Sequence, residues 1–216
     1  MPLTRVKICG LSTPETVKAA IDAGADYLGF NFFLRSPRYV TPTLAAELVR
    51  LVPPNVLNVA LAVDADNATW DAIVVAAKPD ILQLHGNESP ARLTELKARF
   101  GLPLMKAIPV SGPEDLDKMA LYQDCADLLL FDAKPPKSMA NALPGGNGLR
   151  FDWSLLAGQK PDTPWMLSGG LDTDNVAEAI RVTGTEMVDA SSGVEDAPGV
   201  KNPALIASFI RAARST

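Results

Sequence analysis

Two residues at the ends of apolar segments have side chains that could transfer protons. Cys9 ends the segment 5–9, and Asp132 ends the segment 127–132. A thiol can act as a general base once positive groups or helix N-termini lower its pKa. A carboxyl group in apolar surroundings tends to keep its proton and can act as a general acid. The alternatives are a small buried hydrophobic residue for Cys9, and a helix cap or a partner of Lys134 for Asp132.

Two glycine-containing loops near the end of the chain indicate an anion site. Gly169 and Gly170 form one, and Ser192 and Gly193 lie in the other, within residues 189–195. Glycine lets the backbone approach a ligand closely, and N–H groups at a helix start attract anions. A single such loop could be a simple tight turn, but the pair predicts a phosphate site.

Arg38 and His85 are further candidates. Arg38, within residues 35–39, could form a bidentate pair with a ligand carboxylate, although a solvated loop charge is the commoner role for arginine. His85 is the single histidine and lies within residues 83–86. One histidine without clustered ligands does not make a zinc site, so we expect no metal. For His85 we expect ligand shaping or a structural hydrogen bond, with no catalytic role.

The segments between these residues alternate between two patterns. Short runs rich in Val, Ile and Leu predict strands, and stretches of helical period bounded by Ser, Thr, Pro, Asp and Gly predict helices. The predicted strands are 5–9, 27–31, 56–63, 81–84, 104–109, 127–132, 165–168 and 187–190. The predicted helices are 14–23, 44–51, 68–77, 90–100, 114–121, 153–157, 173–182 and 203–213. Residues 133–150, rich in Pro and Gly, predict a long loop of the kind that is often functional.

Eight strand–helix units with continuously apolar strands indicate a parallel sheet covered by helices. An open doubly wound sheet is the alternative. The count of eight, the glycine loops after the last two strands, and the lack of a GxGxxG motif after the first strand favour the α/β class and a (β/α)8 TIM barrel. We expect a single domain over residues 1–216. The C-terminal strand ends, including Cys9, His85 and Asp132, would then surround the active site.

Bulk properties exclude several function classes. The net charge of −5 and the pI near 4.9 disfavour nucleic acid and anionic membranes as partners. Apolar runs fall far short of the roughly 20 residues of a membrane span, and the N-terminus does not resemble a signal peptide. We therefore expect a cytoplasmic protein. Cys9 and Cys125 would lie at opposite barrel ends, so both are expected to be free thiols.

Several motifs in order resemble the phosphoribosylanthranilate isomerase family of tryptophan biosynthesis over nearly the whole chain. They are Val6-Lys7-Ile8-Cys9-Gly10-Leu11, the segment 24–32, Ser36-Pro37-Arg38-Tyr39-Val40, Gln83-Leu84-His85-Gly86, Phe131-Asp132, Gly145-Gly146-Asn147-Gly148, Ser168-Gly169-Gly170-Leu171 and the segment 188–195. The chain departs from the family at Ala60-Leu61-Ala62, where Gly and Phe are usual. It also departs at Asn147, where Thr is commoner. Neither departure touches the proposed acid or base.

The resemblance implies an Amadori rearrangement of N-(5-phosphoribosyl)anthranilate. Asp132 would protonate the ribose ring oxygen, and Cys9 would remove the C2 proton. Arg38 would hold the anthranilate carboxylate, and the loops at Gly169-Gly170 and Ser192-Gly193 would bind the phosphate. Proton transfers suffice for this reaction, so no cofactor is expected. The partner would be a small phosphorylated substrate, and the protein a monomer or homodimer.

Two kinds of rival remain. An indole-glycerol-phosphate synthase or a ribonucleotide isomerase of histidine biosynthesis would place a lysine set or two aspartates at strand ends. Cys9 at the first strand end disfavours both. A non-catalytic barrel that binds phosphate ligands is the other possibility, and the presence of both Cys9 and Asp132 argues against it.

Overall fold

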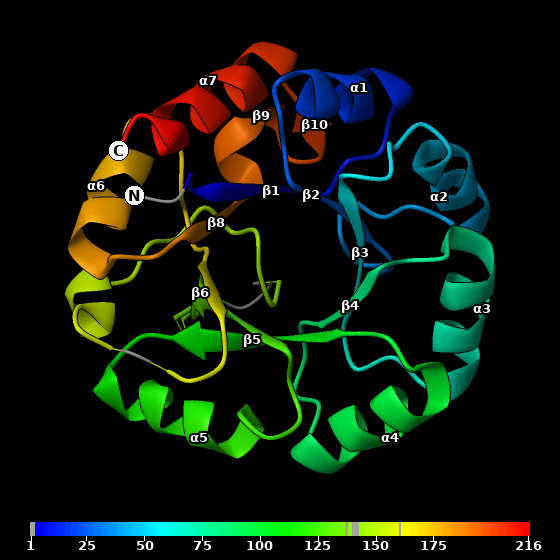
Figure 1. Ribbon diagram of the computed structural model, residues 1–216, viewed down its shortest axis with the longest axis horizontal. Coiled ribbons are helices and arrows are strands. Elements are labelled where there is room, and N and C mark those ends of the chain that lie inside the picture. Colours follow the sequence, from blue (N-terminus) through cyan, green and yellow to red (C-terminus); the bar gives the residue numbers. More distant parts are fainter. Residues whose placement is uncertain (1–2, 137, 140–142, 160) are drawn as a thin grey trace.

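Eight parallel strands close into a barrel in the order β1 to β8, which confirms the predicted TIM barrel (Figure 1). The computed structural model describes residues 3–136, 138–139, 143–159 and 161–216. The strands are β1 (Arg5–Cys9), β2 (Tyr27–Asn31), β3 (Leu57–Ala62), β4 (Ile81–Leu84), β5 (Leu104–Val110), β6 (Leu128–Ala133), β7 (Trp165–Leu167) and β8 (Met187–Ala190). Closure comes from β8, which pairs with β1 and aligns Lys7 with Asp189.

Helices form a ring outside the strands (Figure 1). They are α1 (Pro14–Asp22), α2 (Pro42–Val49), α3 (Asn67–Ala77), α4 (Pro90–Phe100), α5 (Met119–Tyr122), α6 (Val176–Thr183) and α7 (Pro203–Arg214). Local sequence sets their starts, because a side chain just before the helix accepts a backbone N–H in α1, α2, α3, α4 and α7. Proline occupies the first turn of four of these, where its missing N–H costs nothing.

Two predicted helices differ from the structure. The segment 114–121 is a 3-10 helix, Pro113–Lys118, followed by the single turn of α5, and the segment 153–157 is the 3-10 helix Trp153–Leu156. Both segments are short, and 3-10 winding closes hydrogen bonds with fewer residues than an α-helix needs. A hairpin absent from the prediction, β9 (Glu195–Ala197) with β10 (Val200–Lys201), follows β8.

The alternation of side chains along each strand divides the core in two. One set, including Tyr27, Val59, Met105, Leu130 and Met166, consists of strand residues alone and fills the barrel interior. The other set joins the opposite faces of the strands to the helices. The interior is therefore apolar at one end, and polar side chains lie toward the C-terminal strand ends.

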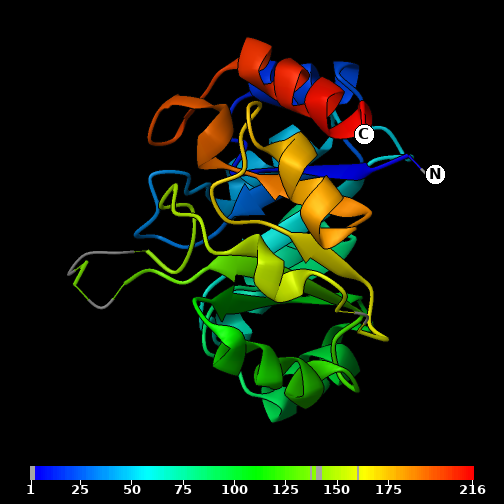
Figure 2. The same cartoon turned by 90° about the vertical axis from the view of Figure 1, so that its left-hand side faces the viewer.

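The loop after β6 lies on the active-site side of the barrel. Figure 2 shows its yellow-green segment projecting on the same side as the β9–β10 hairpin. Residues 137 and 140–142 of the predicted loop 133–150 lie outside the described residues. Its segment 143–149 lines the pocket described below. Within the described chain, every helix is too short or too polar to cross a membrane.

Candidate active site

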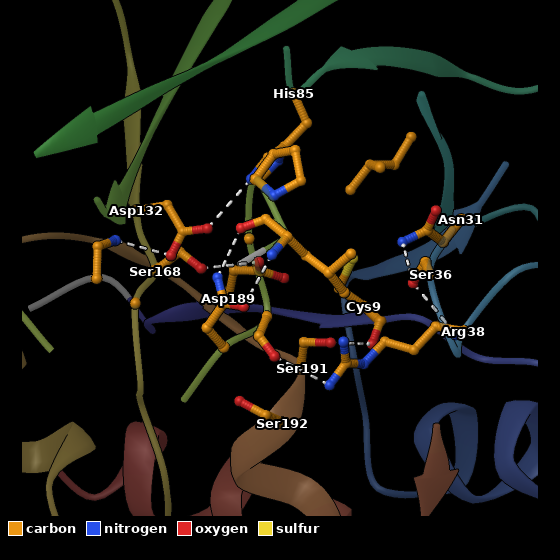
Figure 3. Close-up of a pocket in the computed structure, with 18 of the residues that line it drawn as sticks. Cys9, Asn31, Ser36, Arg38, His85, Asp132, Ser168, Asp189, Ser191 and Ser192 are labelled. Carbon is orange, nitrogen blue, oxygen red and sulfur yellow. Dashed lines mark hydrogen bonds and ion pairs between the residues drawn. The ribbon is translucent and has the colours of Figure 1, made fainter. Parts of the chain in front are cut away.

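A pocket at the C-terminal ends of the strands collects the residues that the sequence singled out. Cys9, Arg38, His85 and Asp132 all line it, and Figure 3 shows them around one space. Its volume is about 710 Å³ including the open mouth, which suits a small metabolite. Gly169, Gly170 and Ser192 also line it. Gly193 is not among the lining residues; it packs against the carbonyl of Leu171.

Cys9 lies on the floor of this pocket and is 5% exposed. Its neighbour across the sheet is Gly29 of β2, where an added Cβ would lie 2.9 Å from the Cys9 Sγ. Glycine at position 29 therefore makes room for the thiol. Burial raises the pKa of Cys9, whereas the positive charges of Lys7 and Lys201 lower it. A thiol that acts as a base needs a lowered pKa, but at Cys9 the effect of burial outweighs that of the two lysines.

A fully buried ion pair lies beside Cys9. The Lys7 Nζ donates to Asp189 Oδ1 at 2.9 Å, and the Ser168 hydroxyl donates to Asp189 Oδ2 at 3.1 Å. Burial lowers the pKa of Lys7, but attraction to Asp189 and Cys9 outweighs it and leaves this pKa above its usual range. Lys7 is thus a fixed positive charge. Sequence reasoning assigned neither Lys7 nor Asp189 a role, although Lys7 lies two residues before Cys9 and Asp189 lies three residues before Ser192.

The Asp132 carboxyl is held by two contacts. Its Oδ2 lies 3.1 Å from His85 Nε2, and its Oδ1 accepts the Ala133 N–H at 2.8 Å. Gln83 Nε2 lies 2.9 Å from His85 Nδ1, which extends the chain of contacts one residue further. His85 was expected to shape the ligand site or to make a structural hydrogen bond, and it contacts the predicted acid directly.

Arg38 belongs to a buried charge cluster that the sequence did not reveal. Its Nε and Nη2 each donate to Glu195 at 2.7 Å, and Nη2 also reaches the Gly146 carbonyl at 3.2 Å. Lys201 Nζ donates to the same carboxylate at 2.6 Å. Arg38 is therefore not the solvated loop charge that was its commoner alternative. Glu195 and Lys201 carried no signal beyond their proximity to the glycine loop in the chain.

The pKa shifts in this cluster follow from burial and charge. Burial disfavours the Glu195 carboxylate, but hydrogen bonds from Arg38 and the charge of Lys201 outweigh this and lower its pKa. Burial lowers the pKa of Lys201 to about 8, with the attraction of Glu195 opposing the shift. Glu195 therefore stays ionised between two cations.

The two glycine loops meet at one side of the pocket. Gly169 and Gly170 have φ of +89° and +63°, a backbone conformation that favours glycine. An added Cβ on Gly193 would collide with the Leu171 carbonyl, so the loops after β7 and β8 pack directly together. The N–H groups of Gly170, Ser192 and Gly193 make no hydrogen bond within the described residues. They are suited to an anion.

Over the described ranges, no group of three or more His, Cys, Asp or Glu side chains is arranged to hold a metal ion. The pocket chemistry is that of one thiol, one carboxyl–imidazole pair and buried cations.

Known proteins match this chain over nearly its full length. The family model described as N-(5'phosphoribosyl)anthranilate (PRA) isomerase matches residues 6–212. The N-(5'-phosphoribosyl)anthranilate isomerase of Parvibaculum lavamentivorans is 67% identical over 97% of this chain and 98% of its own, and that of Cereibacter sphaeroides is 55% identical with the same coverage.

Solved structures of such isomerases also match this chain over nearly its full length. The crystal structure of phosphoribosyl anthranilate isomerase from Thermotoga maritima superposes with a TM-score of 0.88 at 32% identity, covering 99% of this chain and all of that one. A crystal structure of such an isomerase in complex with reduced 1-(o-carboxyphenylamino)-1-deoxyribulose 5-phosphate gives a TM-score of 0.82 at 30% identity, with the same coverage. The chain therefore belongs to the N-(5'-phosphoribosyl)anthranilate isomerase family.

Proposed function

We propose that the pocket catalyses the Amadori rearrangement of N-(5'-phosphoribosyl)anthranilate with Cys9 as general base and Asp132 as general acid. The isomerisation itself, a step of tryptophan biosynthesis, follows from the family. The observation that carries the residue roles is that one pocket is lined by both a thiol and a carboxyl group, each at the C-terminal end of its strand. An isomerisation by two proton transfers needs such a pair.

Asp132 would act first. It donates its proton to the ribose ring oxygen, the C1–O bond breaks with its electron pair going to that oxygen, and the anthranilate nitrogen forms the Schiff base. Cys9 as thiolate would then take the C2 proton, which gives an enolamine that tautomerises to the ketone. Lys7 supports this step because its fixed positive charge favours the thiolate against the cost of burial.

The remaining site residues would bind the substrate. Arg38 has guanidinium N–H groups beyond those that pair with Glu195, and these would hold the anthranilate carboxylate. The glycine loops would hold the phosphate, with N–H groups of Gly170, Ser192 and Gly193 as donors. Gly169 would let the loop after β7 approach it closely.

Four broader expectations are part of the proposal. Proton transfers alone complete the reaction, so we expect activity without an added cofactor. We expect a cytoplasmic location, and one domain over residues 1–216. We expect a monomer or a homodimer; the isomerase of T. maritima is dimeric, and monomers have been generated from it.

A fluorescence assay that follows the loss of freshly made phosphoribosylanthranilate, without metal or cofactor, tests the proposal. Cys9→Ser and Asp132→Asn should each lower turnover by about 10²–10⁴-fold with the fold intact. Matched controls are Cys125→Ser and Asp127→Asn, which lie at the other end of the barrel. Wild-type turnover in both catalytic variants would refute the residue roles. Binding of a phosphorylated product analogue with no turnover would favour a non-catalytic barrel.

A further inference from the structure

Gln83 is a buried amide that the mechanism above does not use. It lies two residues before His85, and because side chains alternate along a strand both point into the barrel. The side chain is fully buried, and its Nε2 contacts His85 Nδ1 at 2.9 Å. Its Oε1 has no hydrogen-bond partner among the residues that the structure describes. The NH₂ end of the amide thus contacts the histidine, and its carbonyl oxygen can accept a further hydrogen bond.

We propose that Gln83 sets the proton state of the His85–Asp132 pair by presenting its NH₂ group to His85 when Nδ1 carries no proton and its carbonyl oxygen when Nδ1 carries one. The proposal rests on the role of Asp132 as general acid. Gln83 acts through His85 and is a positioning residue.

The arrangement in the structure corresponds to the deprotonated pair. Gln83 Nε2 donates to His85 Nδ1, so Nδ1 carries no proton and neutral His85 must carry its proton on Nε2. That proton is donated to Asp132 Oδ2 at 3.1 Å, while Asp132 Oδ1 accepts the Ala133 N–H. Asp132 accepts at both oxygens, as a carboxylate that has given up its proton does.

Uptake of one proton requires the other orientation of the amide. The proton resides either on Asp132 Oδ2, with His85 protonated on Nδ1 alone, or on His85, with both nitrogens protonated. Both forms need an acceptor for Nδ1–H, and half a turn of the Gln83 amide supplies Oε1. In the reaction, Asp132 passes this proton to the ribose ring oxygen and becomes a carboxylate. The amide then returns to the orientation in the structure, so Gln83 serves both states without leaving its position.

The other charged groups around His85 each have a partner of their own. Asp64 accepts the Asn87 N–H, and Cys9 lies elsewhere in the same pocket. The remaining groups form ion pairs, which are Lys106 with Glu88, Lys134 with Asp115, Arg38 with Glu195 and Lys7 with Asp189. Among the residues that the structure describes, Gln83 and Asp132 are therefore the side chains that hydrogen-bond to the two ring nitrogens.

The single histidine makes a direct test possible. Protein labelled with ¹⁵N-histidine gives imidazole nitrogen signals from His85 alone, and these report its tautomer and titration without catalysis. In ligand-free wild type we expect the Nε2–H tautomer at alkaline pH. A neutral Nδ1–H tautomer would overturn the proposal, and this measurement does not depend on a variant that folds.

Two variants then change the acceptor. Gln83→Met leaves Nδ1–H without a partner, so the titration midpoint of His85 should fall by about one pH unit, because an unpaired donor costs most on a charged ring. Gln83→Glu offers a carboxylate to Nδ1–H and should raise the midpoint by a similar amount. Gln123→Met and Gln123→Glu, at an exposed position before β6, are matched controls and should leave the midpoint unchanged. Equal midpoints in wild type and both Gln83 variants would overturn the proposal.

Catalysis supplies a second readout. The acid must be protonated, so kcat/KM falls as pH rises through the midpoint of the pair. This alkaline limb should move down in Gln83→Met and up in Gln83→Glu, in step with the His85 signals. Signals that move while the limb stays fixed would refute the link to the acid. An inactive wild type would refute the proposed function alone, since the tautomer still tests Gln83.

Discussion

Replacing Lys7 with methionine separates two effects of one buried charge. Lys7 is fully buried and pairs with Asp189 at 2.9 Å, and within the described part of the chain Asp189 accepts one further side-chain hydrogen bond, from Ser168. Removing one partner of a buried pair leaves a charge uncompensated and costs about 3–5 kcal/mol. Domains of this kind are stable by about 5–15 kcal/mol, so Lys7→Met should still fold with a much lower free energy of unfolding. Because the pKa of Lys7 is raised in the fold, the stability it contributes is complete at pH 7 and is lost only as pH rises through that raised pKa.

The same substitution should slow catalysis. After burial, the charge of Lys7 has the largest effect on the pKa of Cys9, and it acts to lower that pKa. Its loss raises the pKa further, and each unit means about tenfold less thiolate at fixed pH. We expect kcat/KM at pH 7 to fall by about tenfold or more.

The double variant Lys7→Met with Asp189→Asn distinguishes the two effects. It leaves no uncompensated charge, so urea denaturation should show most of the lost stability restored. Asp189 raises the pKa of Cys9 by less than Lys7 lowers it, so the double variant should remain less active than wild type. Full recovery of kcat/KM would mean that Lys7 merely neutralises Asp189. A single variant as stable as wild type would refute the reasoning about the buried pair.

Gly29→Ala places a methyl group 2.9 Å from the Cys9 Sγ, so turnover should fall at least tenfold while circular dichroism and the melting temperature show a folded protein; unchanged turnover would show that the thiol has room to move. Arg38→Lys cannot reproduce the two hydrogen bonds to Glu195, nor a bidentate pair with the anthranilate carboxylate. The KM for the substrate should therefore rise about as much as in Arg38→Ala, and a wild-type KM would contradict bidentate binding of that carboxylate by Arg38. Because burial raises the pKa of Cys9, its alkylation by iodoacetamide, measured by mass spectrometry, should be slower at pH 7 than that of free cysteine. The alkylation rate should keep rising with pH beyond the pH range in which ordinary thiols ionise, and a fast reaction at pH 7 would contradict the raised pKa.

The elements of this fold were largely determined by local sequence. The strand 5–9 and the helix 90–100 were predicted with their observed bounds, because apolar runs, caps and first-turn prolines act over a few neighbouring residues. The same signals failed for 114–121 and 153–157, where the periodicity was helical but the segments wind as 3-10 helices. The positions of Cys9, His85 and Asp132 at the C-terminal ends of predicted parallel strands also placed them at one end of the barrel.

Only the tertiary structure determined which charged side chains pair with one another and how burial shifts their pKa values. Closure of β8 onto β1 pairs Lys7 with Asp189, and a hairpin absent from the prediction brings Glu195 to Arg38, 157 positions away along the chain. Such pairs depend on the path of the whole chain, which no local pattern encodes. The direction of the Cys9 pKa shift likewise depends on how completely the folded barrel removes water from the thiol. Sequence therefore identified which groups could react, and the fold determined the electrostatic surroundings in which they do so.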